Sequence, residues 1–426
     1  MNVATSEKER AMELIVFEDE WVEQLYPITI GRPTYAVSCA SYRLVDWLLR
    51  LNDSPHSIVR PHLAKLQRED FSQLKPFTNA SGRAALWVNA RLVPSASAFA
   101  ALKSLVQSAA PVAVWQGDQL TAAVTSAGAA GSASSSSAVE PTSLWRRFGL
   151  DTLPRRELPL SLFEYPHDVV RHNMAAMAEN LEARLASGDY REIRDGVFAA
   201  EGATLGEYIV SDTSHGPILL DRSSRVGPYC YLSGPAYLGV GSRVIEHAAI
   251  KDAVSIGHTA KIGGEVEASV IEPFTNKQHH GFLGHSYLGS WINLGAGTCN
   301  SDLKNTYGVV NMDYRGQKIN TGMQFVGCIM GDYAKSAINT GIFTGKTIGA
   351  CSMLYGFVTT NVPSFVNYAR LFGQVTELPP EVMIASQQRM FQRRNVQQRD
   401  CDVQLIHDMY ELTRDERQLA GEPLSL

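Results

Sequence analysis

A chain of 426 residues exceeds the length of one ordinary domain, so two or three folded units are expected. Its 45% hydrophobic content is that of a globular protein, and its formal charge of -5 argues against a general attraction to nucleic acid or anionic membrane, so any anion site has to be local. Six scattered cysteines without a CxxC pair argue against a zinc site or a disulfide framework and fit a reducing cytoplasm.

The first residues are charged and lack the apolar core of a secretory signal. No run of about 18 apolar residues offers a membrane span. We therefore expect a soluble cytoplasmic protein that binds neither nucleic acid nor membrane.

Residues 1–121 alternate between strand and helix patterns, which predicts a small α/β layer domain. Strands are expected at 14–17, 84–93 and 111–115, and helices at 42–51 and 98–108.

Three further segments flank or follow this domain. Residues 122–143 form an Ala/Gly/Ser-rich tract with little to bury, which predicts a flexible linker. Residues 144–217 read as a mostly helical bridge. Residues 377–426 carry a broken apolar stripe, typical of a helical tail that packs on its own chain or on a neighbouring subunit.

From residue 220 onward a hydrophobic residue recurs every six positions, a period that neither a helix nor an ordinary strand has. The phase holds at Leu220, Val226, Leu232, Leu238, Val244, Ile250, Ile256 and Ile262, and returns at Phe282, Leu288, Leu294, Met330, Ile342, Ile348 and Leu354. Such a period is typical of a parallel β-helix, in which each turn has three short strands and each strand adds one inward side chain. We predict this fold for residues 218–376.

Small residues and glycines recur in the same register. The fourth position after an anchor is small at Ser224, Cys230, Ala236, Ser242, Ala248 and Ala260. Glycine often follows the anchor, as at Gly227, Gly239, Gly257, Gly263, Gly289, Gly295 and Gly349. We expect these glycines at corners where the backbone turns.

The period fails at 268–281 and at 300–325, and both segments are rich in polar side chains. A polar cluster held on a rigid framework is the usual plan of a binding site. We therefore expect ligands to bind near these two interruptions.

The string FLGHSYLGSWINLGAGT (282–298) resembles the acyltransferase part of the bacterial bifunctional enzymes that acetylate glucosamine 1-phosphate and uridylylate the product. Phe274-Thr275-Asn276-Lys277 resembles that family's FVExK segment, and Lys318-Ile319-Asn320-Thr321 its K-x-x-T segment. Near the N-terminus, LYPITIGRP (25–33) resembles a PLTxxRPK stretch of its nucleotidyltransferase domain. The chain as a whole is similar to divergent relatives described as sugar nucleotidyltransferases or glucose-1-phosphate thymidylyltransferase-like proteins.

The resemblance implies an α/β plus β architecture: a degenerate nucleotidyltransferase-like α/β domain, a left-handed parallel β-helix and C-terminal helices. It further implies a homotrimer with sites between the coils.

The resemblance also implies site residues. His285 would be the catalytic base, because a neutral imidazole can accept the proton of an attacking amine near neutral pH. Asn293 and Ala296 would hold the thioester end of acetyl-CoA, and Asn293 would also face the substrate. Lys277, Tyr287 and Lys318 would bind the sugar phosphate.

Alternatives remain at these positions. His285 is either the base or a histidine satisfied at a corner, because one residue separates it from Tyr287 where the family has two, and the next turn is shorter by one hexad. His279 and His280 are second candidates for the base.

The expected first strand, 14–17, leads into Glu18-Asp19-Glu20-Trp21, without the glycines that a phosphate loop needs. Arg32 is a candidate nucleotide ligand and Asp118 a candidate metal ligand, with Mg²⁺ required only if this domain is active.

Three functions are therefore open. The first is an acyl-CoA-dependent N-acyltransferase acting on an amino sugar phosphate or a sugar nucleotide. The second is an active sugar-1-phosphate nucleotidyltransferase using UTP or dTTP, with a structural coil. The third is a non-catalytic scaffold that binds sugar nucleotides.

Overall fold

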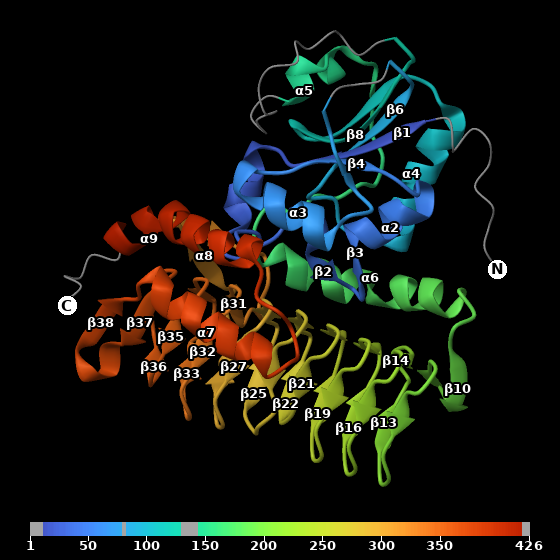
Figure 1. Cartoon of the computed structure of the whole chain (residues 1–426). Helices are drawn as coiled ribbons and strands as arrows, with labels where there is room; N and C mark the ends of the chain where they lie inside the picture. Colours follow the sequence, from blue (N-terminus) through green and yellow to red (C-terminus); the bar gives the residue numbers. More distant parts are fainter. Residues whose placement is uncertain (1–11, 79–81, 129–143, 420–426) are drawn as a thin grey trace. The chain divides into compact units, whose positions relative to one another are not determined.

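A computed structural model describes residues 12–78, 82–128 and 144–419, which group into two compact units (Figure 1). The N-terminal unit is built from the described residues of Met1–Leu25, Arg32–Val37 and Tyr42–Glu164. The C-terminal unit is built from those of Tyr26–Gly31, Ser38–Ser41 and Tyr165–Leu426.

A seven-stranded mixed sheet forms the centre of the N-terminal unit. Its strands lie in the order β5 (Lys75–Pro76), β4 (His56–Ile58), β1 (Glu13–Phe17), β6 (Ala85–Asn89), β8 (Gln119–Thr125), β7 (Val112–Gln116) and β9 (Arg155–Arg156). The first four strands are parallel to one another, and β8 runs antiparallel to both of its neighbours. The chain goes from β1 to β4 on one side and returns to β6 on the other. Ligands of α/β sheets bind at the carboxyl ends of strands at such a reversal.

Alternate side chains of β1 and β6 face opposite layers, as expected for strands buried on both sides. Leu14 and Leu86 pack with helices α2 (Leu44–Leu51) and α4 (Ala96–Ser108). Ile15 and Trp87 pack with the segment that contains α5 (Leu144–Arg147). The short helix α3 (Ala64–Asp70) precedes β5. These elements confirm the predicted α/β layer domain.

The C-terminal unit is a coil of short parallel strands stacked in three faces. The first face contains β10 (Arg191–Arg194), β11 (Val197–Ala199), β14 (Ile218–Leu220), β17 (Ala236–Leu238), β20 (Val254–Ile256), β23 (Val270–Ile271), β26 (Tyr287–Leu288), β31 (Cys328–Met330) and β34 (Lys346–Ile348). The edge strand β10 is antiparallel to β11, and the others are parallel.

The second face contains β12 (Thr204–Leu205), β15 (Arg225–Val226), β18 (Arg243–Val244), β21 (Lys261–Ile262), β24 (Asn276–Lys277), β27 (Asn293–Leu294), β32 (Lys335–Ser336), β35 (Met353–Leu354), β37 (Val366–Ala369) and β38 (Gln374–Glu377). The third contains β13 (Val210–Asp212), β16 (Tyr231–Ser233), β19 (Ala249–Lys251), β22 (Glu265–Glu267) and β25 (Phe282–Gly284), followed by β28 (Cys299–Asn300), β33 (Gly341–Ile342) and β36 (Phe357–Val358).

The uninterrupted anchors from Leu220 to Ile262 are all buried in one core cluster, together with Leu288, Leu294 and Ile348. The small residues at the fourth position are also buried. This arrangement is the β-helix that the hexapeptide period predicts, and the fold class is confirmed.

The structure differs from the sequence prediction in where the coil begins. Residues 144–217 were expected to be a helical bridge, but only α6 (Asp168–Leu185) is a long helix, and β11, β12 and β13 already form a turn of the coil. The inward positions of this turn, Ala199, Leu205 and Ser211, keep the six-residue spacing. The hydrophobic phase does not reveal the turn because two of the three residues are small or polar and because the corner between Ser211 and Leu220 is longer. Of the predicted flexible tract, residues 122–125 end β8, and 129–143 lie outside the described residues.

The two interruptions of the period also have different structures. At 268–281 no loop leaves the coil: β23 and β24 continue the stack in register, and only the corner lengths change. At 300–325 a hairpin is inserted, formed by β29 (Asn311–Tyr314) and β30 (Gln317–Asn320). We call residues 301–326 the insertion.

The chain ends in α7 (Pro380–Gln392), α8 (Asp400–Leu412) and α9 (Arg414–Leu419). The ring of Phe391 lies 4.5 Å from that of Trp291, so α7 packs on its own coil. Within the described ranges, none of the helices has an apolar stretch of membrane-spanning length.

Candidate functional site

A histidine–aspartate pair marks the edge of the coil at the insertion. His285 follows β25 at the corner between the third and first faces, and its Nδ1 lies 2.9 Å from Oδ2 of Asp302. Both side chains are mostly buried, with 12% and 13% exposed. The imidazole also stacks on Phe325, with ring centroids 5.2 Å apart.

The local chain explains how the pair forms. His285 has a φ of +45°, so the corner turns through the left-handed region. Asp302 lies at the start of the insertion and Phe325 near its end, and the backbone of Asp302 accepts a hydrogen bond from Val326. The insertion therefore supplies both side chains that contact the ring, Asp302 and Phe325.

The hydrogen bond fixes the chemistry of the ring. A carboxylate ion only accepts hydrogen bonds, so in the neutral imidazole of His285 the proton is on Nδ1 and the lone pair is on Nε2. Nε2 has no hydrogen-bond partner among the described residues. A histidine whose far nitrogen is held by a carboxylate can accept a proton and have the resulting charge stabilised.

Lys277 occupies an inward position of the coil. It lies in register with Ile262, and only 2% of it is exposed. Its ammonium donates to the carbonyl oxygens of Gly263, His279 and Gly281 at 2.8, 3.3 and 2.8 Å. Burial lowers the pKa of Lys277 to about 8. The expected contact with a sugar phosphate is therefore not favoured, because the ammonium points into the coil.

Tyr287 is also buried and hydrogen-bonded to another residue of the chain. Its ring is fully buried on the first face, and its hydroxyl lies 2.9 Å from Oε1 of Glu272. The same carboxylate accepts hydrogen bonds from the backbone and hydroxyl of Ser38. This network explains Tyr287 as a structural residue rather than the expected substrate ligand.

The remaining predicted residues of the coil lie at its surface. Asn293 is exposed on β27, and its Oδ1 accepts a hydrogen bond of 2.8 Å from Asn276. Ala296 is half-buried at the following corner, and Lys318 is exposed on β30. The imidazoles of His279 and His280 are exposed. Neither forms the buried carboxylate pair that His285 has.

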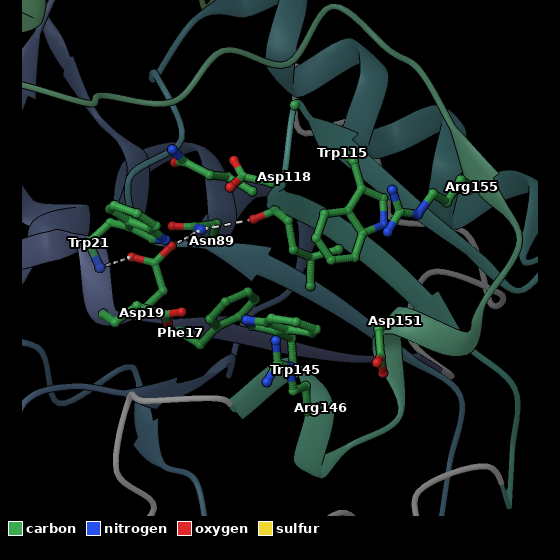
Figure 2. A pocket seen from close by; sticks show the side chains of 14 residues that line it. Phe17, Asp19, Trp21, Asn89, Trp115, Asp118, Trp145, Arg146, Asp151 and Arg155 are labelled. Carbon is green, nitrogen blue, oxygen red and sulfur yellow. Dashed lines mark hydrogen bonds between the residues drawn. The ribbon is translucent and has the colours of Figure 1, made fainter.

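A second candidate site lies in the N-terminal unit. A cavity of about 550 Å³ opens at the carboxyl ends of β1 and β6. Figure 2 shows Trp21, Trp115 and Trp145 around it. The guanidinium of Arg155 lies 4.5 Å from the ring centroid of Trp115. Asp118 is exposed at the turn between β7 and β8 and lines this cavity, whereas Arg32 does not.

Two carboxylates of the acidic run after β1 are neutralised by buried arginines. Asp19 receives hydrogen bonds of 2.8 and 2.7 Å from Arg91, which is fully buried, and one of 2.7 Å from Asn89. Burial acts most strongly on Glu18, but the charge and hydrogen bonds of Arg60 outweigh it and hold the pKa of Glu18 below its usual value. These two carboxylates are therefore held in place where a phosphate loop would lie.

The residues of this cavity do not fit a metal site. In the part of the chain that the structure describes, no group of three His, Cys, Asp or Glu side chains could hold an ion. Asp19 is engaged by Arg91, and the other carboxylates that line the cavity with Asp118 are those of Glu20 and Asp151. Metal binding by Asp118 stays a prediction without structural support.

Comparisons with known proteins find similarity over parts of the chain. Residues 14–187 match the family model described as sugar nucleotidyl transferase. The bifunctional sugar-1-phosphate nucleotidylyltransferase/acetyltransferase of Sulfurisphaera tokodaii is 31% identical over 103 residues, which cover 24% of this chain and 26% of the relative. The bifunctional protein GlmU of Acidithiobacillus ferrooxidans is 37% identical over 84 residues, 19% of this chain and 18% of the relative.

The chain is similar to members of this bifunctional family over these segments. Its matches span about a quarter or less of the length of these two members. A solved UDP-N-acetylglucosamine acyltransferase of Francisella novicida is similar at 16% identity, with a TM-score of 0.32, over 55% of this chain and 79% of that one.

Sequence reasoning missed the carboxylate partner of His285. Asp302 was visible only as one polar residue of the second interruption, 17 positions along the chain from the histidine. The tryptophans of the N-terminal cavity were also missed, because their spacing follows no motif. Trp21 and Trp115 had one signal, a position just after or at the end of a predicted strand, and Trp145, in the predicted helical bridge, had none.

Proposed function

We propose that the chain is an N-acyltransferase that uses an acyl-CoA, with acetyl-CoA as the proposed donor, and acts on an amino sugar phosphate or a sugar nucleotide. The observation that carries the proposal is the His285–Asp302 pair beside the insertion. The similarity to the bifunctional family supports the substrate class.

In the proposed reaction the amine attacks the thioester carbonyl of the acyl-CoA, a C–N bond forms and the C–S bond breaks. Nε2 of His285 accepts the proton that the amine loses and passes it to the departing thiolate, so free coenzyme A leaves as a thiol. Asp302 keeps Nδ1 protonated and stabilises the transient imidazolium. The exposed Asn293 and the half-buried Ala296 are the proposed contacts for the acyl-CoA, and Lys318 is the proposed contact for a phosphate.

The test measures thiol release from acetyl-CoA with a panel of amino sugar phosphates and nucleotide-linked amino sugars. Wild type should release thiol with at least one acceptor. His285→Ala should lower kcat about 10²- to 10⁴-fold, the usual contribution of a positioned general base. His280→Ala, which removes an exposed histidine nearby, is the control and should keep wild-type activity. Thiol release that depends on His280 instead would reject the assignment.

The second candidate function is sugar-1-phosphate nucleotidyl transfer in the N-terminal unit. The match to the sugar nucleotidyl transferase model and the cavity at the carboxyl end of β1 favour it. The segment after β1 opposes it. Asp19 there is paired with Arg91, and the segment contains none of the glycines whose backbone N–H groups would contact a triphosphate. Mg²⁺-dependent pyrophosphate release from UTP or dTTP with a sugar 1-phosphate would establish this activity. Ligand binding without either reaction would leave a scaffold.

A further inference from the structure

A row of unpaired cations runs along the second face of the coil. Arg225, Arg243 and Lys261 occupy matching positions on β15, β18 and β21 and lie directly beside one another in register. Arg393 and Arg394, just after α7, lie close enough to Lys261 to lower its pKa together with Arg243, although burial is the larger cause. We call these five residues the cationic row.

None of the five forms an ion pair with a carboxylate of the described residues. Arg394 donates only to the carbonyl oxygen of Thr259, at 3.4 Å. Glu246 lies three residues after Arg243 and makes no ion pair with it. The third face shows the contrast, because there Lys251 is paired with Glu265 and Glu267 at 2.6 and 3.3 Å.

Like charges placed directly opposite each other on neighbouring strands destabilise a sheet. The chain keeps them although its net charge is -5, so the row is a local concentration of positive charge. An anion that lies across the strands would remove the repulsion. Two strand spacings amount to about 10 Å, which holds two or three phosphate groups rather than a long polyanion.

Exposed aromatic rings follow the row at the next corner. Tyr208 and Tyr229 are 68% and 54% exposed, and their rings stack 4.9 Å apart. His247 continues the stack at 5.3 Å from Tyr229. The three residues have φ values of +57°, +58° and +61°, a conformation uncommon for aromatic residues. A flat ring beside unpaired cations is the combination that binds a base together with its phosphates.

We propose that the cationic row and the adjacent aromatic corner bind the diphosphate and base of a nucleotide. Coenzyme A and a nucleotide-linked sugar share this chemistry. The site lies on a different face from the corner of His285. With coenzyme A as its ligand it rests on the proposed function, because Asn293, the proposed acyl-CoA contact, lies in the same column. Asn276 and Asn293 continue the same column of positions and supply neutral hydrogen-bonding groups beyond Lys261.

The test uses isothermal titration of the full-length chain with desulfo-coenzyme A, UDP-N-acetylglucosamine and inorganic pyrophosphate. Arg243→Gln/Lys261→Gln removes two central cations, and Arg156→Gln/Arg191→Gln removes two exposed arginines elsewhere. One of the two nucleotides should bind wild type. The Kd of the Arg243→Gln/Lys261→Gln variant for that nucleotide should be about tenfold higher or more, and the slope of its log Kd against log salt concentration should be smaller by about two. The control pair should bind like wild type. Binding of desulfo-coenzyme A would identify coenzyme A as the ligand, and binding of UDP-N-acetylglucosamine would identify a nucleotide-linked sugar.

Two readouts separate binding from folding and from catalysis. The unliganded Arg243→Gln/Lys261→Gln variant should unfold at the same or a higher temperature than wild type, because the repulsion is relieved. His285→Ala should keep nucleotide binding, so loss of acyl transfer alone would reject only the proposed function.

The proposal is overturned if neither nucleotide binds wild type, or if the row variant binds as tightly as wild type. It is also overturned if pyrophosphate binds as tightly as the nucleotides, or if a 12-nucleotide single-stranded RNA probe binds more tightly at the same salt. Self-association that the row variant abolishes, without any nucleotide binding, would assign the row to a contact between copies.

Discussion

His285 shows how one side chain receives its role from a partner that is remote in sequence. The ring sits at a corner of the coil, and Asp302 reaches it from the insertion. The two roles that the sequence left open for His285, a base or a satisfied corner residue, are compatible. The corner holds the ring, and the carboxylate leaves Nε2 available as an acceptor.

Asp302→Asn tests this pairing. An amide can donate to Nδ1 and stabilise the wrong tautomer, so kcat for acyl transfer should fall about 10²-fold or more while KM changes little. The matched control is Asp313→Asn, an exposed carboxylate on the same insertion. Steady-state kinetics of both variants check the prediction, and a fully active Asp302→Asn enzyme would contradict it.

The lowered pKa of Lys277 predicts that the free energy of unfolding depends on pH. Burial lowers its pKa from 10.5 to about 8, so the unfolded chain holds this proton more tightly than the folded chain. The contribution of Lys277 is constant below about pH 8 and becomes more favourable to folding as the pH rises toward about 10.5, by up to about 1.4 kcal/mol per pH unit.

Lys277→Met lacks this titration and serves as the reference. Urea unfolding of both proteins between about pH 7 and pH 10 should show the wild-type free energy of unfolding rising relative to the variant above about pH 8. A difference that stays flat across this range would show that the ammonium is not held as the structure has it.

At the scale of elements, the coil uses its glycines differently from the sequence prediction. The glycines that follow the anchors were expected where the backbone turns, yet none of those seven has a positive φ. They occur because the backbone of the next turn lies against them. The left-handed corners instead carry residues such as Thr259, Phe274 and Trp291. Steric closeness between turns therefore selects these glycines.

Gly257→Ala should destabilise the coil. An added Cβ would lie 2.6 Å from the backbone nitrogen of Pro273, and overpacking of this kind costs about 1–3 kcal/mol. Gly241→Asn is the control, since Gly241 has a φ of +64° with open space around it and asparagine tolerates that conformation. Chemical denaturation should separate the two variants, and equal stability would argue against the close packing.

At the scale of the whole molecule, apolar side chains remain uncovered near the end of the coil. Phe357, on β36, is 56% exposed, and Phe343, just after β33, is 50% exposed. Exposed apolar groups that gather on one sheet are typical of an interface. They support the homotrimer that the family resemblance implies.

Light scattering should therefore give a mass of three times 46.7 kDa for the wild-type chain. Phe343→Glu/Phe357→Glu should lower the mass toward that of one chain without loss of β-structure, because carboxylates cannot be buried against an apolar partner surface. Phe372→Glu, at another exposed phenylalanine, should leave the mass unchanged. A monomeric wild type would reject the trimer.

The sequence alone determined the coil from Leu220 onward and the order of the α/β domain and the coil. A hydrophobic residue every six positions can be buried only if each strand adds one inward side chain, and strand and helix patterns such as those around β1 and α4 are local. The motif around His285 also placed the candidate base.

Only the tertiary structure decided which polar groups are available. Asp302 meets His285 because the insertion folds back, Lys277 turns inward because the preceding corners change length, and Arg91 neutralises Asp19 across 72 positions. Each of these depends on distances between residues far apart in the chain, which no local pattern encodes.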